Sequence, residues 1–304
     1  MTVTRSNRVA LPLAALAVLF GVGLVFTYVV FVQTRLGQRV DDAALAGRAF
    51  VPDGFVEDAW TLLDAIGVVT LAGALGIVVL VGLGRGRAWS AVSAGLVVLG
   101  ANVTTQLLKR VVLTRPDLDV GGSLDLNTLP SGHATVAMSV VVAILFVVPD
   151  RIRVPTAVAG WAYATLVGVS TVTAGWHRPS DAVAAAFVVG VWAVVGLFFL
   201  TWGEADRVAR SADWRTASGT FAVIAVAVVG GVAVLAAASW LGLREVVAWL
   251  EEGPLSVGRR TVAYGAAALG IAATWAAVVA LTTTALGALF PAAASEFDSR
   301  HTIS

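Results

Sequence analysis

The sequence predicts an all-α membrane protein, a polytopic bundle of helices. Of its 304 residues, 58% are hydrophobic and only 13% are charged, and the mean hydropathy is +0.88. A soluble domain of this size carries roughly 25% charged residues. Eight apolar stretches each approach or exceed the length of about 20 residues that a membrane-spanning helix needs. These observations together predict a multi-pass protein of the cell membrane.

The eight predicted spans are rich in Val, Ala, Leu and Gly. The first follows Arg5 and Arg8 and is longer than the roughly 7–15 apolar residues of a secretory signal, so we interpret it as an uncleaved signal anchor. In chain order the spans are residues 9–32, 61–83, 88–108, 132–149, 155–176, 181–202, 217–241 and 261–290.

Three long loops separate the spans, and their charges predict an orientation. The loop at 34–60 contains five acidic residues against three arginines, whereas the short loops at 84–88 and 150–153 are dominated by arginine. Basic loops tend to stay in the cytoplasm. We therefore expect both termini inside and the loops 34–60, 109–131 and 242–260 outside. Within the last of these, residues 244–251 resemble a short helix lying in the membrane interface.

The composition also excludes several kinds of chemistry. There are no cysteines, which excludes disulfides, thiolate metal sites and cysteine nucleophiles. A net charge of +1 gives no indication of nucleic-acid binding. The histidines are too few for a zinc site, and the aspartates are not spaced as a magnesium site. We therefore predict no metal and no cofactor.

Polar residues that are rare in this chain gather in three short motifs. Two of the three histidines occur in Pro130-Ser131-Gly132-His133 and in His177-Arg178-Pro179-Ser180-Asp181, and the single lysine, Lys109, precedes Arg115-Pro116. The loops 109–131 and about 176–181 each join one odd-numbered span to the next. They must then lie on the same side of the membrane, so the three motifs are expected to meet at one depth.

The spacing within the motifs is suited to covalent catalysis on phosphorus. His177 and Asp181 share a face if the segment is helical, and a carboxylate on one ring nitrogen fixes the tautomer and stabilises the imidazolium. Gly132 lets backbone N–H groups approach an anion closely, and a helix N-terminus favours anions. Ordinary helix capping by Ser131 and Asp181 is the structural alternative.

The three motifs resemble those of the type 2 phosphatidic acid phosphatases. That family has a Lys, six residues and Arg-Pro; then Pro-Ser-Gly-His; then Ser-Arg, five residues, His, three residues and Asp. The resemblance implies a six-helix phosphatase core within residues 1–203. It leaves two additional spans in residues 204–293 and a polar tail at 294–304.

The resemblance also implies a role for each site residue. His177 would attack phosphorus to form a phosphohistidine, oriented by Asp181, and His133 would protonate the leaving group. Two departures stand out: five residues rather than six separate Lys109 from Arg115, and Thr171 occupies the position of the family arginine. Arg178 or Arg110 is expected to replace that arginine. The expected phosphate-binding residues are Lys109, Arg115, Ser131, Gly132 and Arg178.

The sequence thus predicts an integral-membrane lipid phosphate phosphatase. It would hydrolyse a lipid phosphomonoester or pyrophosphate without metal, at the extracytoplasmic face. Candidate substrates are phosphatidic acid, phosphatidylglycerol phosphate and polyprenyl phosphates or pyrophosphates. Two alternatives remain open: a phosphotransferase that uses a lipid or sugar alcohol in place of water, and a non-catalytic lipid-binding or transport protein of the same fold. The sequence predicts no oligomeric state.

Overall fold

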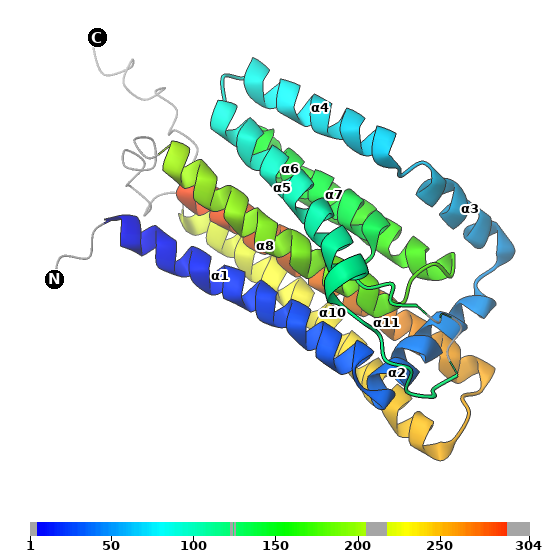
Figure 1. Ribbon diagram of the computed structural model, residues 1–304. Coiled ribbons are helices and arrows are strands. Elements are labelled where there is room, and N and C mark those ends of the chain that lie inside the picture. Colours follow the sequence, from blue (N-terminus) through cyan, green and yellow to red (C-terminus); the bar gives the residue numbers. More distant parts are fainter. Residues whose placement is uncertain (1–4, 122–123, 125, 205–217, 291–304) are drawn as a thin grey trace, which may run out of the picture.

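A computed structural model describes residues 5–121, 124, 126–204 and 218–290, and this part of the chain contains helices and no strand (Figure 1). The predicted all-α membrane bundle is therefore confirmed. The α-helices are α1 (Arg5–Thr27), α2 (Arg35–Ala46), α3 (Asp53–Asp64), α4 (Val68–Gly84), α5 (Ala88–Leu107), α6 (Gly132–Val147), α7 (Asp150–Thr173), α8 (Pro179–Gly203), α10 (Ser218–Glu252) and α11 (Val257–Leu289). Three short helical turns are η1 (Tyr28–Val32), η2 (Gly47–Phe50) and η3 (Leu108–Val112).

All eight predicted spans coincide with helices, but two of them are not simple crossings. Within the described residues, six helices are long and apolar enough to cross a membrane, and a seventh span is formed if α3 and α4 are taken together. These two helices meet at an angle of 63°, so the predicted span at 61–83 is broken at its beginning. The helix α6 has 16 residues, fewer than the roughly 20 of a full crossing.

Two sequence-based expectations about the loops were incomplete or wrong. Residues 244–251 do not form a separate interfacial helix, because α10 continues without a break to Glu252. The loop at 34–60 is largely helical, containing α2, η2 and part of α3. The predicted polar tail at 294–304 lies outside the described residues.

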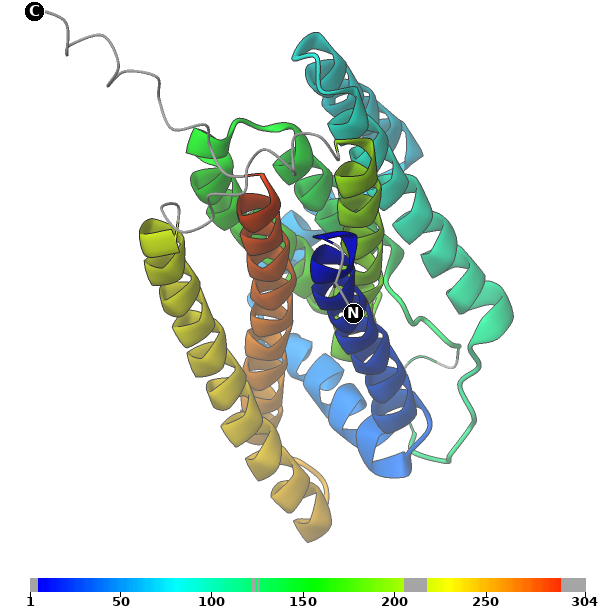
Figure 2. The same cartoon turned by 90° about the vertical axis from the view of Figure 1, so that its left-hand side faces the viewer.

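The helix α8 occupies the centre of the bundle, where it contacts α1, α5, α6 and α11 (Figures 1 and 2). Its small residues allow this close approach. A Cβ atom on Gly190 would lie 2.8 Å from the ring of Phe20 in α1, and one on Gly196 would lie 3.0 Å from Val97 in α5. The helix that carries Asp181 in its first turn is therefore held by packing on several sides.

The last helix, α11, belongs to the same apolar core. Its fully buried Trp275 donates a hydrogen bond from Nε1 to the carbonyl of Ala182 (3.1 Å), and Trp161 of α7 donates to the carbonyl of Ala272 (2.9 Å). Figure 2 shows α10, in yellow, on the outer side of α11. The division of the chain after residue 203 remains a prediction.

The short helix α2 lies across one end of the bundle (Figures 1 and 2). Its apolar residues Val40 and Ala44 pack into a cluster with Val246 and Leu250 of α10, which leaves its acidic residues facing the neighbouring loops. At the opposite end, a shallow hollow is lined by Arg85, Arg87, Pro149, Asp150 and Arg151.

Candidate active site

The loop between α7 and α8 presents His177. The helix α7 ends at Thr173 and is followed by Gly175, whose φ of +77° favours glycine. The backbone N–H groups of Trp176 and His177 both donate to the carbonyl of Thr171 (3.1 Å each). Pro179 occupies the first position of α8, where its missing N–H costs nothing. The backbone hydrogen-bonding groups at the end of α7 and at the start of α8 are therefore accounted for, and the turn between the two helices has a defined shape.

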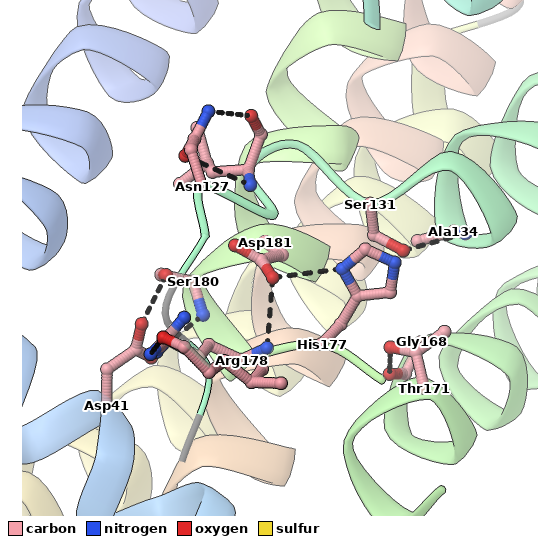
Figure 3. A network of polar contacts seen from close by, with 12 residues as sticks. Asp41, Asn127, Ser131, Ala134, Gly168, Thr171, His177, Arg178, Ser180 and Asp181 are labelled. Atoms are coloured by element: carbon pink, nitrogen blue, oxygen red, sulfur yellow. Dashed lines mark hydrogen bonds and ion pairs between the residues drawn. The ribbon is translucent and has the colours of Figure 1, made fainter. Parts of the chain in front are cut away.

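The carboxylate of Asp181 binds the imidazole and caps the helix with the same oxygen atom. Its Oδ2 lies 2.9 Å from His177 Nδ1 and accepts the backbone N–H of Arg178 at 2.9 Å (Figure 3). Asp181 thus both caps the start of α8 and orients the ring of His177. His177 Nε2 has no hydrogen-bond partner in the part of the chain that the structure describes, so this nitrogen is available to a ligand.

The start of α6 is joined directly to the start of α8. The backbone N–H of Ser131 donates to the carbonyl of Asp181 (3.0 Å), and Ser131 Oγ accepts the N–H of Ala134 (3.4 Å) as an N-cap. An added Cβ on Gly132 would meet only Gln106 Nε2, at 3.5 Å. Packing against other protein atoms therefore does not require a glycine at this position.

The structure brings His133 and Lys109 to the same place. The ring of His133 lies against that of Trp176, with centroids 5.3 Å apart, and its charge interacts with those of His177 and Lys109. The charge of Lys109 also interacts with that of Asp181. Lys109 lies in η3, a π-helical turn of a kind frequent at functional sites. The motif that is one residue short therefore spans a helix end, as expected.

Two arginines share one carboxylate beside this group. Arg178 Nε donates to Asp42 Oδ1 (2.6 Å), and Arg115 Nη2 lies 3.6 Å from Asp42 Oδ2. Both guanidinium groups are buried, with side-chain exposures of 1% for Arg178 and 7% for Arg115. Burial, followed by the positive charge of Arg178, lowers the pKa of Arg115 from its usual value, although an arginine remains charged at any physiological pH.

Thr171, at the position of the family arginine, does not reach the site with its hydroxyl. Its side chain is fully buried, and Oγ1 donates to the carbonyl of Gly168 (2.7 Å). Of the two proposed replacements, Arg110 is exposed and Arg178 is buried. Of the two arginines, Arg178 is therefore the one whose side chain lies inside the protein.

Residues 90–207, which include every predicted site residue, match the PAP2 superfamily. The match runs from the first turn of α5 to just beyond the end of α8. No curated protein and no solved structure matches the chain. Similarity to this superfamily supports a phosphoester hydrolase of the phosphatase type, or a related activity. It does not specify the substrate.

Sequence reasoning missed three polar residues around the candidate site. Asn127 donates to the carbonyls of Leu113 (3.1 Å) and Leu129 (3.2 Å) and so fixes the segment before Ser131. Asp41 and Asp42 come from α2, outside the PAP2 match. The predicted loop that contains these two residues also carries exposed acidic residues. The sequence does not indicate which of these carboxylates face the interior of the protein.

Asp41 is expected to make folding stability depend on pH. Burial, followed by the nearby charge of Asp181, raises the pKa of Asp41 to about 7, while Ser180 and Arg178 oppose the shift; Arg115 also faces this carboxylate. In the unfolded chain an aspartate titrates near about 3.9. Between these values the folded protein retains a proton that the unfolded chain releases, so this contribution to stability is present below about pH 4 and is lost as the pH rises to about 7.

The measurement is the unfolding midpoint of the purified protein in detergent at several pH values between 4 and 8. Asp41→Asn keeps an oxygen that accepts the Ser180 N–H and cannot ionise, so it should remove much of the decline. An unchanged decline in Asp41→Asn would assign it to another group.

Proposed function

We propose that this protein is a lipid phosphate phosphatase that works through a phosphohistidine on His177. The observation that carries the proposal is the bond of 2.9 Å between His177 Nδ1 and Asp181, with His177 Nε2 left without a partner in the described residues. One ring nitrogen is held and the other is available, as a nucleophilic imidazole requires.

In the first step, Nε2 of neutral His177 attacks phosphorus while the bond from phosphorus to the ester oxygen of the lipid breaks. Asp181 keeps the proton on Nδ1 and stabilises the positive ring that forms. His133, on the opposing helix α6, donates a proton to the leaving oxygen. In the second step His133 takes a proton from water, which attacks the phosphohistidine and releases phosphate and His177.

The phosphate oxygens would be bound by cations and by the start of α6. Lys109, Arg115 and Arg178 supply positive charge, and the hydroxyl of Ser131 supplies a donor. Gly132 begins α6, where free backbone N–H groups favour an anion. Because packing does not demand a glycine there, close approach of a phosphate is a reason for its presence.

The position of these residues suits a lipid substrate. They lie where α5, α6 and α8 begin or end, which is where lipid headgroups would meet water if these helices cross the membrane. The loop charges favour the extracytoplasmic face of the cell membrane for this end. A transfer reaction would use the same intermediate with an alcohol in place of water.

The deciding experiment measures phosphate release from a panel of lipid phosphates by purified protein in detergent. Phosphatidic acid, phosphatidylglycerol phosphate and polyprenyl pyrophosphate should be included, with EDTA present because no metal is expected to take part. Release from at least one lipid is the expected result. If none is hydrolysed, and no alcohol acceptor restores turnover, the non-catalytic alternative is favoured.

Arg178 is expected to replace the cation lost at Thr171. A charged hydrogen bond contributes about 1.5–3 kcal/mol, so Arg178→Ala should reduce kcat/KM roughly tenfold to a hundredfold. Arg110→Ala removes the same charge from an exposed neighbouring position and should have little effect. Equal kinetics of the two variants would show that the pocket functions without Arg178.

A further inference from the structure

The helix α2 is attached to the segment that carries Arg115. Gln38 Nε2 donates to the carbonyl of Pro116 (3.1 Å), and Arg35 Nε donates to the carbonyl of Leu118 (2.9 Å). Both bonds are made to residues that follow Arg115 within three positions of the chain. The backbone from which Arg115 projects is therefore held by α2 rather than by its own helix, which has ended at Val112.

The same helix is attached to the segment that carries Arg178. Asp41 accepts hydrogen bonds from the backbone N–H of Ser180 (3.1 Å) and from its hydroxyl. Figure 3 shows Asp41 facing Ser180, with Arg178 beside them. Both partners are buried. One surface of α2 thus holds two chain segments that are more than 60 residues apart in the sequence.

Asp42 lies between the two arginines that these segments bring together. Its carboxylate receives Arg178 Nε on one oxygen and pairs with Arg115 Nη2 on the other. Arg178 is oriented further by a bond from Nη2 to the carbonyl of Leu124 (2.6 Å). Two buried guanidinium groups repel each other, and a buried charge that loses its partner is strongly destabilised. The shared carboxylate therefore permits the two cations to lie side by side.

Arg178 also has a buried nitrogen without a hydrogen-bond partner. Arg178 Nη1 makes no hydrogen bond within the described part of the chain, whereas Arg115 Nη2 and Asp42 Oδ2, 3.6 Å apart, have only their ion pair with each other. Leaving a charged donor unpaired is costly. A phosphate group, with several oxygen acceptors, would pair with Arg178 Nη1 and give Arg115 Nη2 a closer acceptor, and the three side chains still have a net charge of +1 when Asp42 is ionised.

We propose that Asp42 is a positioning residue that holds Arg115 and Arg178 together as a phosphate clamp. This inference rests on the proposed function, because it deepens the account of how that site binds phosphate. It assigns part of the site to α2, which lies outside the PAP2 match at residues 90–207. Asp42 acts through the arginines and does not itself contact the substrate.

The test compares Asp42→Asn with Asp58→Asn, which removes the same charge from an exposed position on α3. Inorganic phosphate is titrated into each purified protein in detergent, and the rise in unfolding midpoint is followed, since a ligand of the folded state stabilises it. Asp42→Asn should require about tenfold to a hundredfold more phosphate than the wild type, corresponding to one charged hydrogen bond. Asp58→Asn should behave as the wild type.

A kinetic measurement separates positioning from a general loss of structure. Weaker binding of the phosphate in both substrate and transition state raises KM and leaves kcat nearly unchanged, which is the result expected for Asp42→Asn. A lower KM, or tighter phosphate binding, would mean that Asp42 competes with phosphate, and would overturn the proposal. If Asp42→Asn does not fold, Asp42→Glu is used instead, because it keeps the negative charge but displaces it. A phosphate affinity of Asp42→Glu equal to that of the wild type would contradict the positioning role.

The clamp and the proposed function fail in different ways. If the wild-type protein binds phosphate but hydrolyses no lipid phosphate, the clamp proposal stands and the proposed function is wrong. If phosphate does not change the unfolding midpoint of the wild-type protein, the clamp proposal is wrong, whatever the hydrolysis assay gives.

Discussion

Replacing His177 by alanine is expected to abolish phosphate release, with a loss of several orders of magnitude in kcat. Among the described residues, His177 is the only histidine with a ring nitrogen held by a carboxylate, and water cannot replace a covalent catalyst at a comparable rate. The loss should be similar for every substrate, because the phosphohistidine is common to all of them.

Two further measurements make this prediction specific. His301→Ala changes the only histidine outside the motifs, which lies beyond the described residues, and should retain parental activity. Rapid acid-free quenching of the wild type with radiolabelled substrate should trap a phosphoryl group that is labile in acid and stable in alkali. Turnover by His177→Ala at a substantial fraction of the parental rate would remove this histidine from the mechanism.

Replacing His133 by glutamine is expected to give the second largest effect, and one that depends on the leaving group. General acid catalysis contributes about 10²–10⁴-fold, so hydrolysis of a lipid phosphate should fall by that factor. An aryl phosphate with an acidic phenol needs little protonation as it leaves. Formation of the phosphohistidine from such a substrate should be nearly normal in His133→Gln.

The leaving-group comparison is best made before the steady state. Because His133 also activates water in the second step, His133→Gln should show a burst of phenol close to the enzyme concentration, followed by slow turnover. An equal loss of the first step with both substrates would contradict the role of His133 as the acid. Trp176→Leu, which removes the aromatic ring packed against His133, serves as a control for displacement of the imidazole.

The sequence predicted well what depends on neighbouring residues. The eight spans follow from runs of apolar residues, and each coincides with a helix. The pairing of His177 with Asp181 follows from their spacing of four residues, since the chain between them includes the first turn of α8. The convergence of Lys109, His133 and His177 follows from counting spans, because each intervening pair of crossings returns the chain to the same side.

The sequence alone was a poor guide wherever contacts join distant segments. Nothing in the apolar pattern of residues 61–83 distinguishes a straight span from one that bends by 63° between α3 and α4. Similarly, residues 244–251 have the composition of an interfacial helix but continue α10, because helix propensity does not specify where a long helix leaves the membrane.

The sequence by itself therefore determined the class of fold, the motifs and the residues that carry the proposed chemistry. Only the tertiary structure decided that Arg178 turns inward to Asp42, across 136 residues of chain, and that Thr171 is bonded to its own helix. The physical reason is the range of the interactions. Helix geometry fixes contacts three or four residues apart, whereas the burial of Asp41 and the pairing of Asp42 with both arginines depend on how α2 packs across the end of the finished bundle.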